Sequence, residues 1–280
     1  MAAAATIAAL LTAATPRLAA GGSGRLDAEL LLAHVLAGNR ATLYAAPERT
    51  LAATQVHAFE ALVARRAAGC PLAYLVGRAE FWSLDLVVDE RVLVPRPETE
   101  LLVECVLGVL PPGSVTRLAD LGTGSGAIAC ALAQERPRAT IFASDRSLSA
   151  LEMARRNVAR HGAGRVQVLA GDWLAPFGTA TLDVVVANPP YVAMAESHLM
   201  NAATAFEPRA ALFAAGDGLA DLAAIIADGR RVLRPGGWLL VEHGLAQGAA
   251  VRALLGEHGY GAIATHRDLA GHERVSLGRG

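Results

Sequence analysis

The sequence predicts an α/β protein with a mostly parallel seven-stranded sheet, an antiparallel pair of strands at one edge, and a small N-terminal all-α domain. From about residue 117 onward there are seven short runs rich in Val, Ile and Leu, and the first five alternate with segments of helical periodicity. Such alternation is typical of parallel strands covered by helices on both faces. The last two runs are separated by turn residues only, so we expect them to pair antiparallel. Apolar residues at helical spacing between residues 26 and 67 predict the helical domain.

The expected elements fall into three parts along the chain. Residues 1–76 are expected to form a bundle of short helices, interrupted at Gly38-Asn39 and at Pro47. Residues 77–97 are expected to form a β-hairpin linker, because apolar residues alternate with polar ones on both sides of a turn at residues 89–91. Residues 98–280 are expected to hold the main sheet, with strands at residues 117–121, 139–145, 165–170, 182–187, 238–243, 261–266 and 273–277.

Composition narrows the classes of function. The 280 residues are 53% hydrophobic and 18% charged with a formal net charge of −1, so electrostatic attachment to nucleic acid is disfavoured. All 25 basic residues are arginine, which excludes enzymes that need a Schiff-base, P-loop or kinase lysine. The three cysteines lack disulfide or zinc spacing, the histidines lack metal-like spacing, and no segment has the length of a membrane span. We expect a cytoplasmic protein with no metal and no membrane association.

Three strand ends offer groups suited to one ligand. The glycine-rich turn Gly122-Thr123-Gly124-Ser125-Gly126 follows the first strand, where it lets the backbone approach a ligand, and its spacing differs from the dinucleotide-binding pattern. Asp145 ends the second strand, where one carboxylate can accept hydrogen bonds from both hydroxyls of a ribose. Asp172 and Trp173 follow the third strand and suit the amino group and ring of adenine. Each residue alone has a structural explanation, but together they predict a Rossmann-like site for S-adenosylmethionine.

The fourth strand ends in the most specific motif, Asn188-Pro189-Pro190-Tyr191. A conjugated NH2 group, as in a carboxamide or adenine, is a poor nucleophile and must be held by two acceptors with its nitrogen aimed at the methyl donor. The side-chain oxygen of Asn188 and the carbonyl of Pro189 can supply both, because the prolines restrain the backbone. Tyr191 is expected to pack on the flat face of the substrate group. No strong general base is needed, because the nitrogen becomes acidic as it is alkylated.

The chain resembles the peptide chain release factor glutamine methyltransferases, known as the PrmC or HemK family, along essentially its whole length. Besides the Asn-Pro-Pro-Tyr motif, the matching stretches are residues 80–83, 94–100, 206–209, 242–244 and 273–275. The resemblance implies a class I S-adenosylmethionine-dependent methyltransferase that modifies the side-chain nitrogen of the glutamine in the Gly-Gly-Gln motif of class-1 release factors. S-adenosylhomocysteine would be the second product, and translation termination the process affected.

The resemblance also implies roles for particular residues. The turn from Gly122 to Gly126, with Asp145, Trp173 and Asn188, would bind the cofactor, and Asp172 is expected beside them. The segment from Asn188 through Pro189 and Pro190 to Tyr191 would bind the glutamine amide. Residues 1–76 would dock the release factor and residues 98–280 would form the methyltransferase domain.

Several residues near these motifs have less definite expectations. Arg96 and Glu98 are expected to hold the linker or to touch the amino-acid end of the cofactor. Glu207 and Arg209 are expected to brace the substrate loop by pairing with each other. His243 is expected to be a hydrogen-bonded structural residue and not a base.

Other functions remain open at the level of sequence. A glutamine methyltransferase of a ribosomal protein would need the same active site, and an adenine amino-methyltransferase would present the same NH2 chemistry. The latter should carry a basic region for phosphates, and residues 1–80 show only scattered arginines. A binding module without activity is disfavoured by the intact motifs. We expect a monomer without stable nucleic-acid binding.

Overall fold

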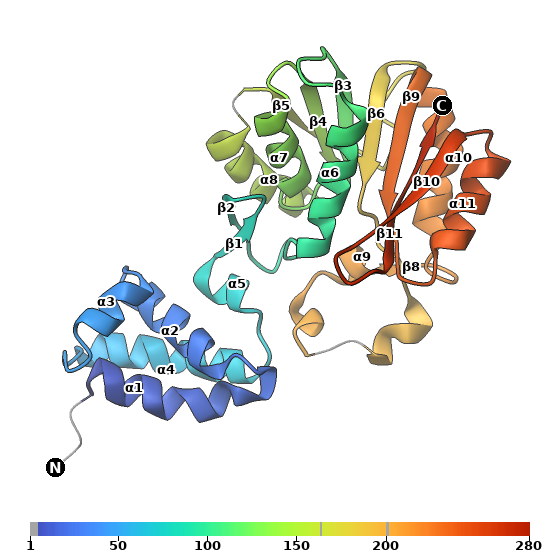
Figure 1. The fold of residues 1–280 in the computed structure, drawn as a ribbon. Coiled ribbons are helices and arrows are strands. Elements are labelled where there is room, and N and C mark those ends of the chain that lie inside the picture. The colour runs from blue at the N-terminus through green and yellow to red at the C-terminus, as the bar shows by residue number, and fades with distance from the viewer. Residues whose placement is uncertain (1–4, 163, 200–201) are drawn as a thin grey trace. The chain divides into compact units, whose positions relative to one another are not determined.

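The computed structural model describes residues 5–162, 164–199 and 202–280, and these divide into two compact units (Figure 1). One unit comprises residues 1–78 with 201–206, and the other comprises residues 79–200 with 207–280. The first is helical and the second is built on a sheet. Within the described ranges, no helix is long and apolar enough to cross a membrane.

The helical unit confirms the expected N-terminal all-α domain. Its elements are α1 (Ile7–Ala14), η1 (Thr15–Gly21), α2 (Gly24–Val35), α3 (Arg40–Ala45), α4 (Ala53–Ala67) and α5 (Leu72–Val76). Asn39 is the N-cap of α3, because its side chain accepts a hydrogen bond from the Thr42 amide at 3.1 Å. Leu31, Leu32 and Phe59 are fully buried in the core of this unit.

A buried carboxylate ties α2 and α3 of the helical unit together. Glu29 on α2 is 1% exposed and accepts hydrogen bonds from Arg25, Arg40 and the Tyr44 hydroxyl at 2.6 to 2.8 Å. Burial by itself would raise the pKa of Glu29, but the hydrogen bonds from Tyr44, Arg25 and Arg40 outweigh it and lower the pKa to about 2. This interaction therefore stabilises the fold above the ordinary pKa of a glutamate and is lost as the pH falls toward 2.

Substitution of Glu29 should loosen the helical unit. We expect Glu29→Gln to increase hydrogen exchange of protected amides in residues 24–45 by about 10- to 100-fold at neutral pH, because a charged hydrogen-bonding group is lost. Hydrogen-exchange mass spectrometry of the full chain measures this directly. Glu60→Gln is the control, because Glu60 pairs with Arg17 at the surface, where ion pairs contribute little. Equal protection in the wild type and the Glu29 variant would contradict the prediction.

The position predicted for the β-hairpin turn is wrong. The paired strands are β1 (Arg78–Phe81) and β2 (Leu84–Val87), and they are joined at Trp82-Ser83, both of which have positive φ (53° and 58°) as in a type I′ turn. A turn does form at residues 89–91, where Asp89 accepts hydrogen bonds from the amide and side chain of Arg91. Residues 92–96, however, do not form the second strand of a hairpin. The amide of Val92 donates to the Asp89 carbonyl within this turn at 3.2 Å, and the amide of Val94 donates to a distant residue, Glu207, at 3.1 Å.

The main sheet has the predicted seven strands in the order β10-β11-β9-β6-β3-β4-β5 (Figure 1). The strands are β3 (Arg117–Leu121), β4 (Thr140–Asp145), β5 (Val166–Ala170), β6 (Leu182–Ala187), β9 (Leu233–Glu242), β10 (Gly261–Arg267) and β11 (Glu273–Arg279). The first five pair in parallel, and β11 pairs antiparallel with both β9 and β10. The prediction of an antiparallel pair at the edge is confirmed.

Helices cover both faces of this sheet, as the apolar strands require. Leu118 on β3 and Val184 and Val186 on β6 pack with α6 (Glu100–Val109) and α7 (Ala127–Glu135), and α8 (Leu148–His161) lies beside α7. Odd-numbered residues such as Ala119 and Val185 pack with α10 (Ala220–Val232) and α11 (Gly248–Glu257). Because successive side chains point to opposite faces, burial of both faces explains the continuous apolar runs.

The carboxyl ends of the parallel strands meet at one edge of the sheet. Leu121 at the end of β3 is in register with Ser144 on β4 and with Ala187 on β6, and Ala187 is in register with Val241 on β9. The residues that follow these strands are therefore neighbours in space. After β6 the chain forms η3 (Met194–Leu199), α9 (Arg209–Leu212) and a short parallel pair, β7 (Val192–Ala193) with β8 (Phe213–Ala214), while η4 (Thr204–Phe206) belongs to the helical unit.

Candidate active site

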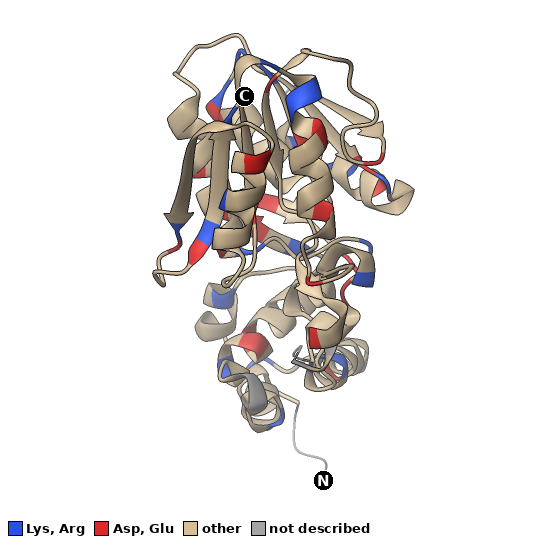
Figure 2. Ribbon diagram, turned by 90° about the vertical axis from the view of Figure 1, so that its right-hand side faces the viewer, with Lys and Arg blue, Asp and Glu red and all other residues tan. Residues whose placement is uncertain are grey.

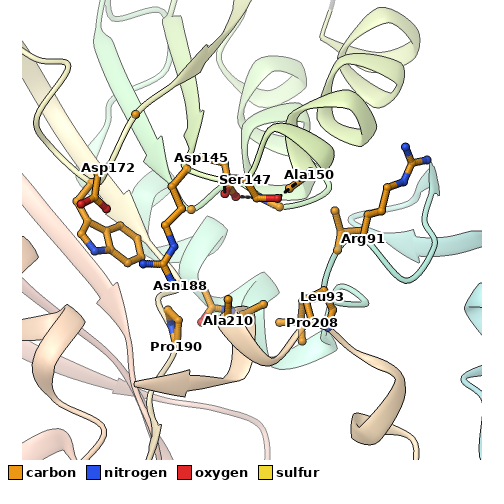
Figure 3. Close-up of a pocket in the computed structure, with 17 residues that line it drawn as sticks. Arg91, Leu93, Asp145, Ser147, Ala150, Asp172, Asn188, Pro190, Pro208 and Ala210 are labelled. Atoms are coloured by element: carbon orange, nitrogen blue, oxygen red, sulfur yellow. Dashed lines mark hydrogen bonds between the residues drawn. The ribbon is translucent and has the colours of Figure 1, made fainter. Parts of the chain in front are cut away.

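A cavity lies at this edge of the sheet, within the unit that contains residues 79–200 and 207–280. Asp145 and Asp172 lie on one side, Asn188 and Pro190 lie across from them, and Leu93 and Pro208 lie together farther along the same side as Asn188 (Figure 3). The full lining is Arg91, Val92, Leu93, Gly122, Gly124, Asp145, Arg146, Ser147, Ala150, Gly171, Asp172, Trp173, Asn188, Pro190, Pro208, Ala210 and Ala211. Four separate strand ends thus contribute to one cavity.

The glycine-rich turn is held to the end of β4 by the carboxylate of Asp145. The Gly124 amide donates to Oδ2 of Asp145 at 3.0 Å, and the Ser147 amide donates to Oδ1 at 2.8 Å. Gly122 and Gly124 have φ of +63° and +54°, a conformation that other residues rarely adopt. Each oxygen of Asp145 has a further lone pair, so the carboxylate can still accept hydrogen bonds from a ligand in the cavity.

Trp173 packs directly on the glycine-rich turn. A Cβ atom at Gly122 would lie only 3.1 Å from Cζ3 of Trp173, so this position accepts no larger residue without displacing the ring. The indole Nε1 donates to Oδ1 of Asp221 on α10 at 3.1 Å. Trp173 also has a φ of +42°, which is unusual for a large side chain and indicates that its surroundings hold it in place.

The Asn-Pro-Pro-Tyr motif is anchored by two side-chain hydrogen bonds. Nδ2 of Asn188 donates to Oγ1 of Thr99 at 3.0 Å, and the Tyr191 hydroxyl donates to Oε1 of Glu242 at 3.2 Å. Burial raises the pKa of Tyr191, and the nearby charge of Glu242 raises it further, so the phenol remains protonated. The side-chain nitrogen of Asn188 is therefore already hydrogen-bonded, and its side-chain oxygen Oδ1 is the atom that can accept a hydrogen bond from a ligand.

Asp120 supports the glycine-rich turn from within the sheet. Its Oδ2 accepts hydrogen bonds from the Thr123 hydroxyl at 2.6 Å and from the Ala129 amide at 3.2 Å, whereas Oδ1 is buried without a partner among the described residues. Burial raises the pKa of Asp120 to about 7, although those two hydrogen bonds oppose the rise and the charge of Asp145 adds to it. A proton on Asp120 is therefore stable in the folded protein at mildly acidic pH.

This proton should make stability depend on pH. The unfolded chain releases it near pH 3.8 and the folded chain near pH 7, so the free energy of unfolding should fall as the pH rises between these values. We expect Asp120→Asn to remove this dependence, which amounts to about 4 kcal/mol at most. Urea unfolding at a series of pH values, followed by tryptophan fluorescence, measures the difference, because all three tryptophans lie in the sheet unit. A constant difference between wild type and variant across this range would contradict the prediction.

Not every residue predicted for the site lines the cavity. The cavity brings together Gly122, Gly124, Asp145, Asp172, Trp173, Asn188 and Pro190. The others are not among the lining residues: Thr123 bonds to Asp120, Ser125 and Pro189 are buried, Gly126 is the N-cap of α7 and Tyr191 bonds to Glu242. The lining also includes Arg91, Arg146 and Ser147, which the sequence analysis did not identify, because charged and polar residues in loops carry no distinguishing pattern.

The expected pairing of Glu207 with Arg209 is wrong. Glu207 is 4% exposed and forms an ion pair with Arg96, and its Oε1 accepts a hydrogen bond from the Val94 amide at 3.1 Å. Pro208, between the two residues, is the N-cap of α9, and the guanidinium of Arg209 instead lies over the ring of Phe213 at 4.7 Å. Glu207 therefore joins the two segments, residues 92–96 and 207–211, that close one side of the cavity, and Arg96 itself is outside the lining.

Other reactive side chains have structural surroundings. Both ring nitrogens of His243 have hydrogen-bond partners, the carbonyl of Gly244 at 3.0 Å and the hydroxyl of Ser276 at 2.9 Å, and burial lowers the pKa of His243. The three cysteines are buried and free. In the part of the chain that the structure describes, no cluster of His, Cys, Asp or Glu side chains is arranged to hold a metal ion.

Comparison with known proteins identifies the family. Residues 9–77 match the PrmC N-terminal domain, and residues 97–218 match the methyltransferase small domain. The release factor glutamine methyltransferase of Xylella fastidiosa (strain 9a5c) is 48% identical over 271 residues, which cover 97% of each chain. That of Escherichia coli (strain K12) is 44% identical over 269 residues, covering 96% of this chain and 97% of the relative. The chain belongs to the release factor glutamine methyltransferase family.

As a release factor glutamine methyltransferase, this enzyme uses S-adenosylmethionine as its methyl donor. The solved structure of a methyltransferase from Pyrococcus furiosus has the same fold, with a TM-score of 0.50 and 19% identity over 70% of this chain and 88% of that chain. The cavity fits the donor's chemistry. Two carboxylates, Asp145 and Asp172, can accept from hydroxyl and amino groups, and Trp173, whose ring packs on Gly122, lines the same cavity and can contact an aromatic base.

Proposed function

We propose that this enzyme methylates the side-chain amide nitrogen of the glutamine in the Gly-Gly-Gln motif of class-1 peptide chain release factors, and so modulates translation termination. The observation that carries the proposal is the position of Asn188-Pro189-Pro190-Tyr191 at the end of β6, with Asn188 and Pro190 on the wall of the cavity. Relatives 48% and 44% identical to this chain are named for the same reaction.

The same proposal places the binding site for the methyl donor at the carboxyl ends of the parallel strands. The turn from Gly122 to Gly126, with Asp145, Asp172, Trp173 and Asn188, would hold S-adenosylmethionine. When bound, it supplies a methyl group carried on a positively charged sulfur. Asp145 would accept hydrogen bonds from the ribose hydroxyls, and Asp172 and Trp173 would contact adenine. No residue of the chain needs to form a covalent bond with the donor.

The substrate amide would be oriented by two acceptors. Oδ1 of Asn188 and the carbonyl of Pro189 would each accept one hydrogen of the glutamine NH2 group, and the ring of Tyr191 would pack on its flat face. The nitrogen then forms a bond to the methyl carbon as the bond between that carbon and sulfur breaks. The nitrogen loses one proton to water, because alkylation makes it strongly acidic. Orientation and not base catalysis would be the main contribution of the chain.

Mass spectrometry of a release factor after incubation with this enzyme and S-adenosylmethionine tests the proposal. We expect one added methyl group on the glutamine of the Gly-Gly-Gln motif, and none in a release factor in which that glutamine is replaced. Total ribosomal protein and DNA are included as alternative acceptors. Methylation of either one, with an unmodified release factor, would overturn the proposal in favour of that acceptor.

Residues 1–76 are proposed to dock the release factor. A family match over residues 9–77 supports this assignment. We expect an intact release factor to have a higher kcat/KM than an isolated peptide that contains the Gly-Gly-Gln motif, because docking adds binding surface away from the reacting group. Equal values for the factor and the peptide would argue against docking.

We also propose a cytosolic monomer that does not bind nucleic acid stably. Acidic and basic residues are interspersed along both units (Figure 2), and the chain has 25 basic and 26 acidic residues. Light scattering coupled to size-exclusion chromatography tests the oligomeric state. Tight, salt-sensitive DNA retention in a filter-binding titration would contradict the second part.

A further inference from the structure

A group of buried polar side chains connects the Asn-Pro-Pro-Tyr motif to β9. Thr99, which accepts the hydrogen bond of Asn188 Nδ2 at 3.0 Å, is 5% exposed. Glu242, which accepts the hydrogen bond of the Tyr191 hydroxyl at 3.2 Å, is 1% exposed. The Thr99 hydroxyl is near enough to the Glu242 carboxylate to favour its ionised form, but among the described residues Oε2 of Glu242 is buried without a hydrogen-bond partner. Asn188 and Tyr191 therefore both reach one carboxyl group, Asn188 through Thr99 and Tyr191 directly.

The direction of the Thr99 hydroxyl proton decides how Asn188 is held. A hydroxyl has one proton to donate and can accept through its lone pairs. Because Oγ1 of Thr99 accepts from Asn188, its own proton can turn to another acceptor, and the nearby unpartnered Oε2 of Glu242 offers one. An ionised carboxylate can only accept hydrogen bonds, so it keeps the Thr99 hydroxyl proton pointing toward Glu242 and away from Asn188. The Asn188 nitrogen is then held at Thr99.

We propose that Glu242 is a positioning residue for methyl transfer, acting through Thr99 to fix which end of the Asn188 amide faces the substrate glutamine. Glu242 also holds the hydroxyl of Tyr191 and so the ring that follows the two prolines. The proposal rests on the proposed function, because it concerns the acceptor that the glutamine NH2 group needs. If the Asn188 amide were reversed, its NH2 group would face the NH2 group of the substrate glutamine. Two donors cannot hydrogen-bond to each other, so the substrate would not be oriented.

A glutamine at position 242 removes this control while keeping the size of the side chain. Its NH2 group can donate to Thr99, which frees the hydroxyl proton to turn toward Asn188 and allows the amide to reverse. We expect Glu242→Gln to lower kcat by about 10- to 100-fold, the order of effect of a misplaced reacting group. The dissociation constant of S-adenosylmethionine, measured by calorimetry, should change less than about twofold, since Glu242 is not part of the cavity lining.

Two further variants test whether Thr99 transmits the effect. Thr99→Val keeps the shape and removes the hydroxyl, and it should lower kcat by a similar factor. The double variant should lose little more than either single variant, because both act through the same contact. Glu135→Gln is the matched control: Glu135 also accepts a hydrogen bond from an aromatic side chain, Nε1 of Trp82 at 2.9 Å, but lies on the surface. Its kcat should equal that of the wild type.

The pH dependence of kcat gives a second readout. Burial raises the pKa of Glu242 to about 7, and the charge of Glu98 adds to the rise. Three groups oppose it by favouring the ionised form: the Thr99 hydroxyl, the charge of Arg274 and the hydrogen bond from Tyr191. In the wild type, kcat at saturating substrates should therefore rise with pH through about 7 as Glu242 ionises. Glu242→Gln should lack that part of the rise. A rise of equal size in the variant would belong to another group and would count against the proposal.

Nuclear magnetic resonance tests the orientation without any turnover. The chain has only four asparagines, so selective labelling of asparagine side-chain nitrogen gives a simple spectrum, and Asn188→Ala identifies the Asn188 signal. That signal should shift in Glu242→Gln and in Thr99→Val and remain unchanged in Glu135→Gln. An unchanged signal and unchanged kcat in Glu242→Gln would overturn the proposal. Should Glu242→Gln fail to fold, Thr99→Val decides by the same two readouts. A wild-type enzyme that does not methylate release factors would refute the proposed function, and the spectra would still decide the positioning role.

Discussion

Replacement of Asn188 by alanine is expected to lower kcat/KM for release factor methylation by about 100- to 1000-fold, or about 3 to 4 kcal/mol of transition-state stabilisation. The side chain offers Oδ1 at the wall of the cavity while its nitrogen is bound to Thr99. Its removal eliminates one of the two acceptors that hold the substrate amide. Initial rates with an intact release factor measure the effect, and thermal unfolding in parallel measures stability.

Asn157, the other asparagine of this unit, is fully buried and provides a contrasting case. Its side chain bonds to the amide and carbonyl of Val87 and to the carbonyl of Ser125, at 2.7 to 2.9 Å. Asn157→Ala leaves these main-chain groups unpaired, so we expect it to reduce the free energy of unfolding by about 2 to 4 kcal/mol. Asn188→Ala loses only one hydrogen bond to a hydroxyl, so its stability should change much less. Wild-type activity in Asn188→Ala would contradict the assignment of the active site.

Replacement of Asp145 by alanine is expected to weaken binding of S-adenosylmethionine by about 10- to 100-fold, because charged hydrogen bonds contribute about 1.5 to 3 kcal/mol. Two effects combine. The ribose hydroxyls lose their proposed acceptor, and the amides of Gly124 and Ser147 lose the carboxylate that holds the glycine-rich turn against the end of β4. Isothermal titration calorimetry with the full chain measures the dissociation constant.

Asp183→Ala is the matched control for this experiment. Asp183 also accepts a hydrogen bond from a main-chain amide, that of Arg117 at 2.8 Å, and it pairs with Arg234 at 2.9 Å. It lies near the start of β6 and outside the cavity lining, so donor binding should be unaffected. If both aspartate variants bind S-adenosylmethionine equally, Asp145 has no special contact with the donor.

Local sequence patterns were sufficient to predict the strands of the sheet and the functional residues that follow each strand at its carboxyl edge. Buried parallel strands need continuous apolar runs, and these were recognisable at residues 117–121 and 182–187 without any knowledge of their partners. Since parallel strands end at the same edge, the residues after them, Gly122, Asp145 and Asn188, could be expected to share one cavity, and they do. The periodicity of the helical unit was equally local.

Contacts between segments far apart in the chain could be known only from the tertiary structure. Asn188 and Thr99 are 89 residues apart, and Glu207 and Arg96 are 111 residues apart. Neither pair has a spacing or pattern that distinguishes it, and the nearer pairing of Glu207 with Arg209 proved wrong. The alternation at residues 84–94 similarly suggested one hairpin, although the two-residue turn at Trp82-Ser83 places the strands earlier.

The sequence by itself determined the fold class, the cavity-forming strand ends and the chemical groups available there, because backbone hydrogen bonding and apolar burial follow short-range patterns. Only the tertiary structure decided how those groups are oriented. The direction of the Asn188 amide, the protonation of Asp120 and the surroundings of Glu242 depend on burial and on hydrogen-bond partners contributed by other elements. A buried polar group takes its charge and direction from what surrounds it in space, and these neighbours are not adjacent in the chain.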